Sequence, residues 1–206
     1  MSAAESTVFV IDDEPSVRKS LGRLLKASGY RVEAFASARE FLQRQPDAGV
    51  GCLVLDVQMP ELNGLELQQC LAETDRALPI IFITAHGDIP TSVRAMKAGA
   101  TDFLSKPFHE KDLLEAIARA LERARQQSSE RAVSAEIKRR LATLTPREHE
   151  VLLHVLTGQL NKQIAAALGG SEKTVKVHRG RVMRKMQVQS VAELVRLCQK
   201  AGVRGP

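Results

Sequence analysis

The chain has 206 residues, of which 44% are hydrophobic and 26% charged, and its net charge is +6. This composition is typical of globular proteins, and no run approaches the roughly 18 apolar residues of a membrane span. The N-terminal stretch MSAAESTVFVIDDE lacks a basic segment followed by an apolar one, so we expect no secretory signal. The chain has three cysteines without a CxxC spacing, which argues against a structural metal site with cysteine ligands and against a disulfide framework. This cysteine usage favours a cytoplasmic location.

The charge is unevenly distributed along the chain. Residues 1–125 carry 15 Lys and Arg against 18 Asp and Glu, a net charge of −3. Residues 126–206 carry 15 Lys and Arg against 6 Asp and Glu, a net charge of +9. This asymmetry predicts two modules, the second of which faces a polyanion, although a solvated basic surface is the alternative.

The first 125 residues alternate short apolar runs with segments of helical periodicity. Runs rich in Val, Ile, Leu and Phe predict strands at residues 7–12, 31–36, 51–56, 79–84 and 101–106. Apolar residues three and four positions apart predict helices around residues 17–25, 65–71, 93–100 and 113–121. This alternation predicts an α/β domain with a doubly wound, five-stranded parallel sheet covered by helices on both faces.

The composition changes after residue 121. Residues 122–140 are polar, contain no Gly or Pro, and predict a helical linker. From residue 141 onward only helical patterns occur, and they predict a small all-α domain of four short helices. We therefore expect a first domain at 1–125, a helical linker at 126–141 and a second domain at 142–206.

Polar side chains stand at the carboxyl ends of four predicted strands. They are Asp12, Asp13, Asp56, Thr84 and Lys106. In an open parallel sheet these ends form the ligand-binding edge, so the five side chains are expected to converge. Carboxylates at close quarters repel one another unless a divalent cation joins them, and oxygen ligands favour Mg²⁺. A carboxylate beside Mg²⁺ and a lysine can attack phosphorus. Taken singly, each residue has a structural alternative, such as helix capping or a surface charge.

Four segments of the first domain resemble the receiver domain of two-component response regulators. They read VIDDE, LVLDVQMPELNG, FITAHGD and MKAGATDFLSKPF, and the similarity covers about residues 5–125. The resemblance implies a flavodoxin-like fold in which Asp56 accepts phosphate from a histidine kinase in a Mg²⁺-dependent reaction. It also implies that Asp12, Asp13, Asp56 and the backbone carbonyl of Gln58 hold the metal.

The same resemblance assigns a conformational switch to residues of the fourth and fifth predicted strands. Thr84 corresponds to the switch hydroxyl, Phe103 to the switch aromatic and Lys106 to the phosphate-contacting lysine. The resemblance also implies that the Lys106–Pro107 bond is cis, a geometry that is nearly confined to proline. Phosphorylation adds charge and acceptor oxygens, and we expect it to favour a homodimer. A core aromatic is the alternative for Phe103.

The basic domain predicts a helix-turn-helix. Pro146 begins a helix, Asn161 caps the next one over NKQIAAALG, and GGS makes the turn. The following helix, from about residue 171, buries a stripe of Val175, Val182 and Met186 and carries many cations. A basic second helix after a glycine turn is the layout that enters the major groove of double-stranded DNA.

The second domain resembles the LuxR/NarL-type (GerE-type) DNA-binding domain in the sequence motifs LTPRE, NKQIA and TVKVHR. The whole chain resembles FixJ-like regulators in the motif TAHGDIP and in the length of its linker. By this resemblance Lys176 and Val177 reach base edges. The full expected DNA-contact set is Lys173, Thr174, Lys176, Val177, His178, Arg179, Arg181, Arg184 and Lys185. A FixJ-like character also implies transcription activation, with RNA polymerase as an expected partner.

Three classes of function compete for these features. A phosphorylation-gated transcription regulator explains both domains. A phosphohydrolase that turns over substrate usually carries a second acid two residues after the nucleophile, where this chain has Gln58. A phosphate-independent adaptor is the third. The final helix, residues 190–200, is expected either to pair with a second copy or to pack in the domain core.

Overall fold

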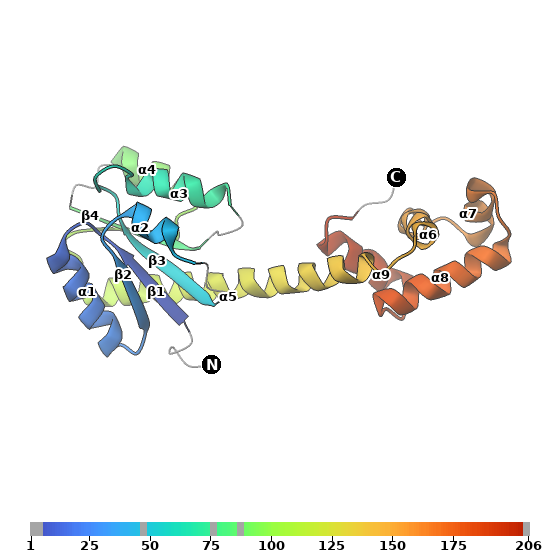
Figure 1. Cartoon of the computed structure of the whole chain (residues 1–206), viewed down its shortest axis with the longest axis horizontal. Helices are drawn as coiled ribbons and strands as arrows, with labels where there is room; N and C mark the ends of the chain where they lie inside the picture. The colour runs from blue at the N-terminus through green and yellow to red at the C-terminus, as the bar shows by residue number, and fades with distance from the viewer. Residues whose placement is uncertain (1–5, 46–48, 75–77, 86–88, 204–206) are drawn as a thin grey trace. The chain divides into compact units, whose positions relative to one another are not determined.

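The sheet of the first unit is parallel throughout. A computed structural model of the chain describes residues 6–45, 49–74, 78–85 and 89–203. Its strands are β1 (Ser6–Ile11), β2 (Arg31–Phe35), β3 (Val50–Asp56), β4 (Ile80–Thr84) and β5 (Asp102–Ser105). They lie in the order β2-β1-β3-β4-β5 (Figure 1). The predicted doubly wound, five-stranded parallel sheet is therefore confirmed.

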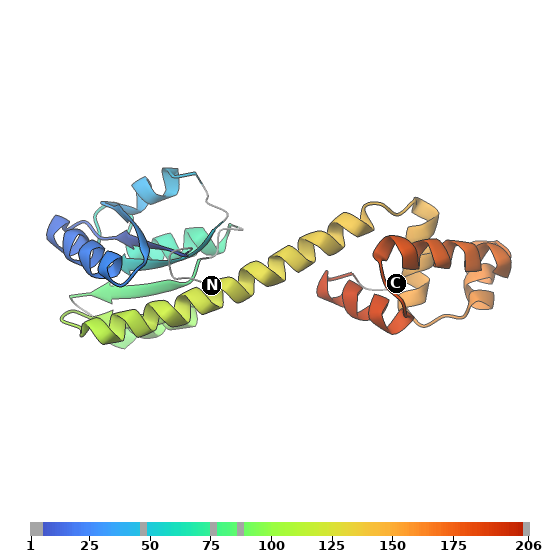
Figure 2. The same cartoon turned by 90° about the horizontal axis from the view of Figure 1, so that it is seen from below.

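Helices cover both faces of this sheet. They are α1 (Pro15–Ala27), α2 (Ala38–Gln43), α3 (Gly64–Ala72), α4 (Ile89–Lys97) and the first part of α5 (Glu110–Leu141). Viewed from below in Figure 2, α1 and the first part of α5 lie on the near side of the sheet. Phe9 and Ile11 of β1 pack on the side of α2, α3 and α4, whereas Val8 and Val10 pack on the side of α1 and α5. This alternation along one strand produces the two apolar layers.

Helix α5 has 32 residues and confirms the predicted helical linker, because it continues without a break through residues 126–141. The described residues divide into two compact units between Ser128 and Ser129, inside this helix. Among the described helices, none combines the length and the apolar character of a membrane span.

The second unit is all helical, as predicted. After the end of α5 it contains α6 (Pro146–Leu156), α7 (Asn161–Leu168), α8 (Glu172–Met186) and α9 (Val191–Lys200). Their buried residues form one core, which also includes Ile137 of α5. Leu194 and Cys198 of α9 are buried in it. Core packing thus accounts for the apolar face of α9 that these two side chains define.

Candidate functional site

The pairing of β1 with β3 brings the acidic side chains together. Ile11 lies opposite Leu55 in the register, so Asp12 and Asp56 follow at neighbouring strand ends. Carboxylate oxygens of Asp12, Asp13 and Asp56 all lie within 4.8 Å of one another. Asp12 is fully buried, Asp56 is 8% exposed, and Asp13 faces solvent. Among the described residues of the cluster, Asp13 is therefore the carboxylate most open to solvent.

Lys106 supplies the positive charge of this cluster. Its Nζ lies 2.8 Å from Asp12 Oδ2 and 3.7 Å from Asp56 Oδ2. The other oxygen of Asp12 accepts a hydrogen bond of 2.9 Å from the Glu14 backbone N–H. The Lys106 backbone N–H donates to the Thr84 carbonyl at 2.7 Å, which fixes the end of β5 against the end of β4.

The surroundings of Asp56 change the electrostatics of its carboxyl group. Burial raises the pKa of Asp56, Lys106 opposes that rise, and Asp12 adds to it. The Gln58 backbone N–H also donates to Asp56 Oδ1 at 3.4 Å. One ammonium for three carboxylates leaves an excess of negative charge, which suits a hard divalent cation with oxygen ligands.

The remaining receiver residues lie around this cluster. Thr84 is fully buried at the end of β4, and the Lys106–Pro107 bond is cis. Phe103 is half-buried, with its ring centroid 6.2 Å from that of Phe82, and it packs on the core layer of α2, α3 and α4. Gln58 is exposed in the loop after β3.

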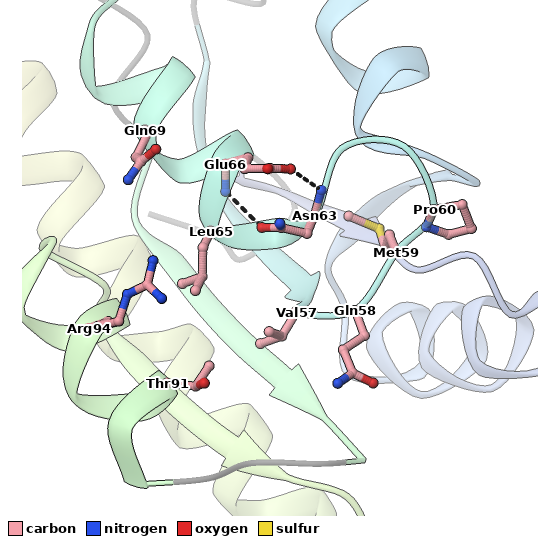
Figure 3. A pocket seen from close by; sticks show the side chains of 10 residues that line it. All are labelled: Val57, Gln58, Met59, Pro60, Asn63, Leu65, Glu66, Gln69, Thr91 and Arg94. Atoms are coloured by element: carbon pink, nitrogen blue, oxygen red, sulfur yellow. Dashed lines mark hydrogen bonds between the residues drawn. The ribbon is translucent and has the colours of Figure 1, made fainter.

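A cavity of about 650 Å³ adjoins the carboxyl end of β3. Figure 3 shows Thr91 and Arg94 of α4 facing Leu65 and Gln69 of α3 across it. The loop that directly follows Asp56 lines the cavity from Val57 to Pro60, and Asn63 and Glu66 complete the lining. The geometry of that loop thus shapes both the acidic cluster and the α3–α4 surface.

Gly64 is a structural requirement that sequence reasoning missed. It is the first residue of α3, and its N–H donates to the Val57 carbonyl at 3.0 Å. A Cβ at this position would lie far inside van der Waals contact with the Asp56 carbonyl oxygen, and 3.0 Å from the Phe82 ring. The only signal in the sequence is a glycine at a helix start that the Asn63–Glu66 capping box already stabilises.

We predict that Gly64→Ala destabilises the receiver unit by about 1–3 kcal/mol, the usual cost of overpacking. Gly22→Ala in α1 is the matched control, because a Cβ there meets open space, and it should add up to about 1 kcal/mol of helix stability. Urea unfolding followed by fluorescence of Tyr30, the single tyrosine of a chain without tryptophan, isolates this unit. Equal stability of the two variants would contradict the close approach.

The second candidate site is the surface of α8. Val175, Val182 and Met186 are buried, as the periodicity predicts. Six of the nine expected DNA contacts are exposed on this helix: Lys173, Thr174, Lys176, Val177, Arg181 and Arg184. Val177 is an exposed apolar side chain within this polar surface.

The other three expected contacts, His178, Arg179 and Lys185, are half-buried. Arg179 donates to Asn161 Oδ1 at 2.9 Å, and Lys185 donates to Glu148 Oε2 at 2.6 Å. The prediction that Asn161 caps α7 is wrong, because the helix begins at Asn161 itself and Leu160 occupies the cap position. The Asn161 side chain binds Arg179 instead.

Glu148 is the buried partner that sequence reasoning missed. It is 2% exposed and belongs to the capping box of α6 with Thr145. Hydrogen bonds from Lys185, and from the Thr145 backbone N–H at 2.9 Å, lower the pKa of Glu148. The LTPRE word contains the spacing of this capping box, but nothing in it points to Lys185.

We predict that Lys185→Met lowers the stability of the second unit at neutral pH by about 1.5 kcal/mol, because a buried carboxylate loses a charged donor that is one-third exposed. Because the pKa of Glu148 is depressed, this contribution is complete above the ordinary glutamate pKa and is lost as the pH falls through the lowered one. The two unfolding curves, measured by circular dichroism, should therefore converge in acid. Arg184→Met, at an exposed neighbouring position, is the control, and an equal loss there would refute the ion pair's role.

Two family matches cover most of the chain. Residues 8–118 match the response regulator receiver domain, and residues 142–198 match the bacterial regulatory proteins of the luxR family. Together with the sheet order and the acidic cluster, these matches define a two-component response regulator with a LuxR-type DNA-binding domain. The family regulates transcription, so the chain is not a turnover enzyme.

Full-length relatives agree with this assignment. Nodulation protein W of Bradyrhizobium diazoefficiens is 48% identical over 202 residues, which are 98% of this chain and 89% of that protein. The transcriptional regulatory protein FixJ of Rhizobium meliloti is 44% identical over 196 residues, 95% of this chain and 96% of that protein. The solved structure of the response regulator StyR matches with a TM-score of 0.81 at 48% identity and covers 96% of this chain and 100% of that one. The chain belongs to the FixJ-like response regulators.

Proposed function

We propose that Asp56 accepts a phosphoryl group from a cognate sensor histidine kinase and that this modification controls binding of α8 to double-stranded DNA. The observation that carries the proposal is the cluster of three carboxylates with Lys106 at one sheet edge, in a chain that also holds a LuxR-type domain. We propose the domain boundaries expected from the sequence. They are a receiver domain at 1–125, a helical linker at 126–141 and a DNA-binding domain at 142–206.

The acidic cluster fits Mg²⁺. Asp12, Asp13 and Asp56 offer carboxylate oxygens close enough to share one ion, and the exposed Asp13 leaves room for water ligands. The backbone carbonyl of Gln58, two residues after Asp56, is the proposed fourth protein ligand. When bound, the ion offsets negative charge on the carboxylates and on the incoming phosphoryl oxygens.

Asp56 is the nucleophile of the transfer. One of its carboxylate oxygens forms a bond to phosphorus while the bond between phosphorus and the donor histidine nitrogen breaks, and that nitrogen keeps the electron pair. Lys106, 3.7 Å from Asp56 Oδ2, is placed to stabilise the new phosphoryl oxygens. Asp12 retains its buried position and orients Lys106.

The switch runs from Thr84 and Phe103 to the surface of α4 and β5. A phosphoryl group on Asp56 attracts the Thr84 hydroxyl, and the space it leaves admits the Phe103 ring, which already packs against Phe82. This rearrangement alters the surface on which the exposed apolar side chains Val93 and Met96 of α4 lie, and a second copy binds there to form a homodimer. The modified form needs only a higher affinity for its partner to shift the population.

In this proposal α8 lies in the major groove. Lys176 and Val177 contact base edges, while Thr174, His178, Arg179 and Arg184 contact phosphates, and Lys173, Arg181 and Lys185 add positive charge beside them. The regulator activates transcription in the cytoplasm together with RNA polymerase. The Rhizobium meliloti relative FixJ is named a transcriptional regulatory protein, which supports a role in transcription.

We predict that acetyl phosphate with Mg²⁺ raises the DNA affinity of the wild-type chain about 5- to 150-fold, the usual range of allosteric coupling. Asp56→Asn should abolish both the phosphorylation and this rise, because the nucleophile is removed. Asp112→Asn, which removes an exposed carboxylate outside the cluster, should behave as wild type. Fluorescence anisotropy with target DNA measures the outcome, and an unchanged phosphodonor response in Asp56→Asn would favour the phosphate-independent adaptor.

We predict different defects for two exposed cations of α8. Lys176→Ala should lose about 1–3 kcal/mol of discrimination at one base pair, whereas Arg184→Ala should weaken binding uniformly and lower the salt slope by about 1. Titration of matched and mismatched duplexes at several salt concentrations separates the two effects. If both variants lost the same affinity on every duplex, the assignment of the base-reading face would be wrong.

A further inference from the structure

The last turn of α5 contacts the carboxyl end of α8 within the second unit. Arg140 donates from Nη1 to the Met186 carbonyl oxygen at 3.1 Å and from Nε to Glu136 Oε1 at 2.8 Å. Met186 is the final residue of α8, so its carbonyl has no partner inside that helix. Arg140 satisfies this carbonyl at the end of the helix where the dipole favours a cation.

A second contact runs in the opposite direction. Lys185 of α8 donates from Nζ to the Thr143 carbonyl oxygen, in the connection between α5 and α6, at 2.8 Å. Ile137, one turn before Arg140, is 2% exposed and packs in the same core as Val182 and Met186. Two hydrogen bonds and one buried side chain therefore join the end of α8 to residues 137–143.

We infer that Arg140, a residue of the linker, is a positioning residue for sequence recognition by α8. The inference rests on the proposed function, in which α8 reads DNA. Arg140 acts through the helix end that it fixes: its side chain is only 21% exposed, and two of its N–H groups are bonded inside the protein. A shift of that helix end moves Lys176 and Val177 relative to base edges. Sequence recognition then depends on a residue that precedes the luxR-family match, which begins at residue 142.

Arg139 provides a matched control. It binds the same Glu136 carboxylate, with its Nε 2.8 Å from Oε2 and its Nη2 2.9 Å from Oε1. Its side chain is 69% exposed, and among the described contacts it makes none with α8. Arg140→Met and Arg139→Met each remove one positive charge and one pairing with Glu136. Only the first of them also frees the Met186 carbonyl.

The test uses the full chain with acetyl phosphate and Mg²⁺. A target duplex is obtained by in vitro selection with the wild-type protein, and a scrambled duplex of equal length serves as nonspecific DNA. Arg140→Met should weaken binding to the selected duplex about tenfold, the size of one charge-assisted hydrogen bond, while its scrambled-duplex affinity matches that of Arg139→Met. Arg140→Lys, which keeps one donor, should restore part of the ratio between the two affinities. It also keeps the test decisive if circular dichroism shows that Arg140→Met is unfolded.

Other outcomes overturn the inference. Equal losses on both duplexes with a smaller salt slope would make Arg140 a phosphate contact. A lower melting temperature with an unchanged affinity ratio would make its role purely structural. A wild-type chain that selects no sequence would defeat the proposed DNA recognition and this inference with it. Selection by wild type, with the same ratio in Arg140→Met and Arg139→Met, would defeat this inference alone.

Discussion

The parallel register of β1 against β3 is the constraint on which the receiver site depends. Ile11 lies opposite Leu55, and both side chains belong to the core layer of α2, α3 and α4. A slip of one residue would exchange the two faces of the strand and place these side chains in the wrong layer. The hydrophobic core therefore sets the spacing of Asp12 and Asp56, although neither carboxylate contributes favourable burial itself.

The cost of that placement is offset locally. Asp12 is fully buried, and a buried carboxylate is destabilising unless it is paired and hydrogen-bonded. Lys106 and the Glu14 backbone N–H satisfy one oxygen each. Asp56 receives weaker compensation, because Lys106 lies nearly an ångström farther from it than from Asp12. Of the two buried carboxylates, the less satisfied one is thus the one to which we assign chemistry.

Much of this arrangement could be predicted from the sequence because it depends on periodic patterns. Alternating strands and helices dictated the sheet, and residues at strand ends then had to share one edge. Gly64 escaped prediction because its close approach to the Asp56 carbonyl depends on how two backbone segments pack. Lys185 looked like any other cation of α8, since its distinguishing partner, Glu148, lies 37 residues earlier in the chain. The cap of α7 was misplaced by one residue, which is the usual precision of helix ends.

The burial of Ile137 has a consequence for modular exchange. Regulators of this kind invite chimaeras in which one receiver is joined to another DNA-binding domain, and the start of the luxR-family match at residue 142 is an obvious junction. A graft made there would leave behind the Ile137 side chain, which belongs to the same buried core as Met186. The recipient helix would have to supply an apolar residue of similar volume at the same helical phase, or a cavity would remain. Compatibility between a receiver and a DNA-binding domain thus depends partly on which residue the end of the linker helix supplies to the core.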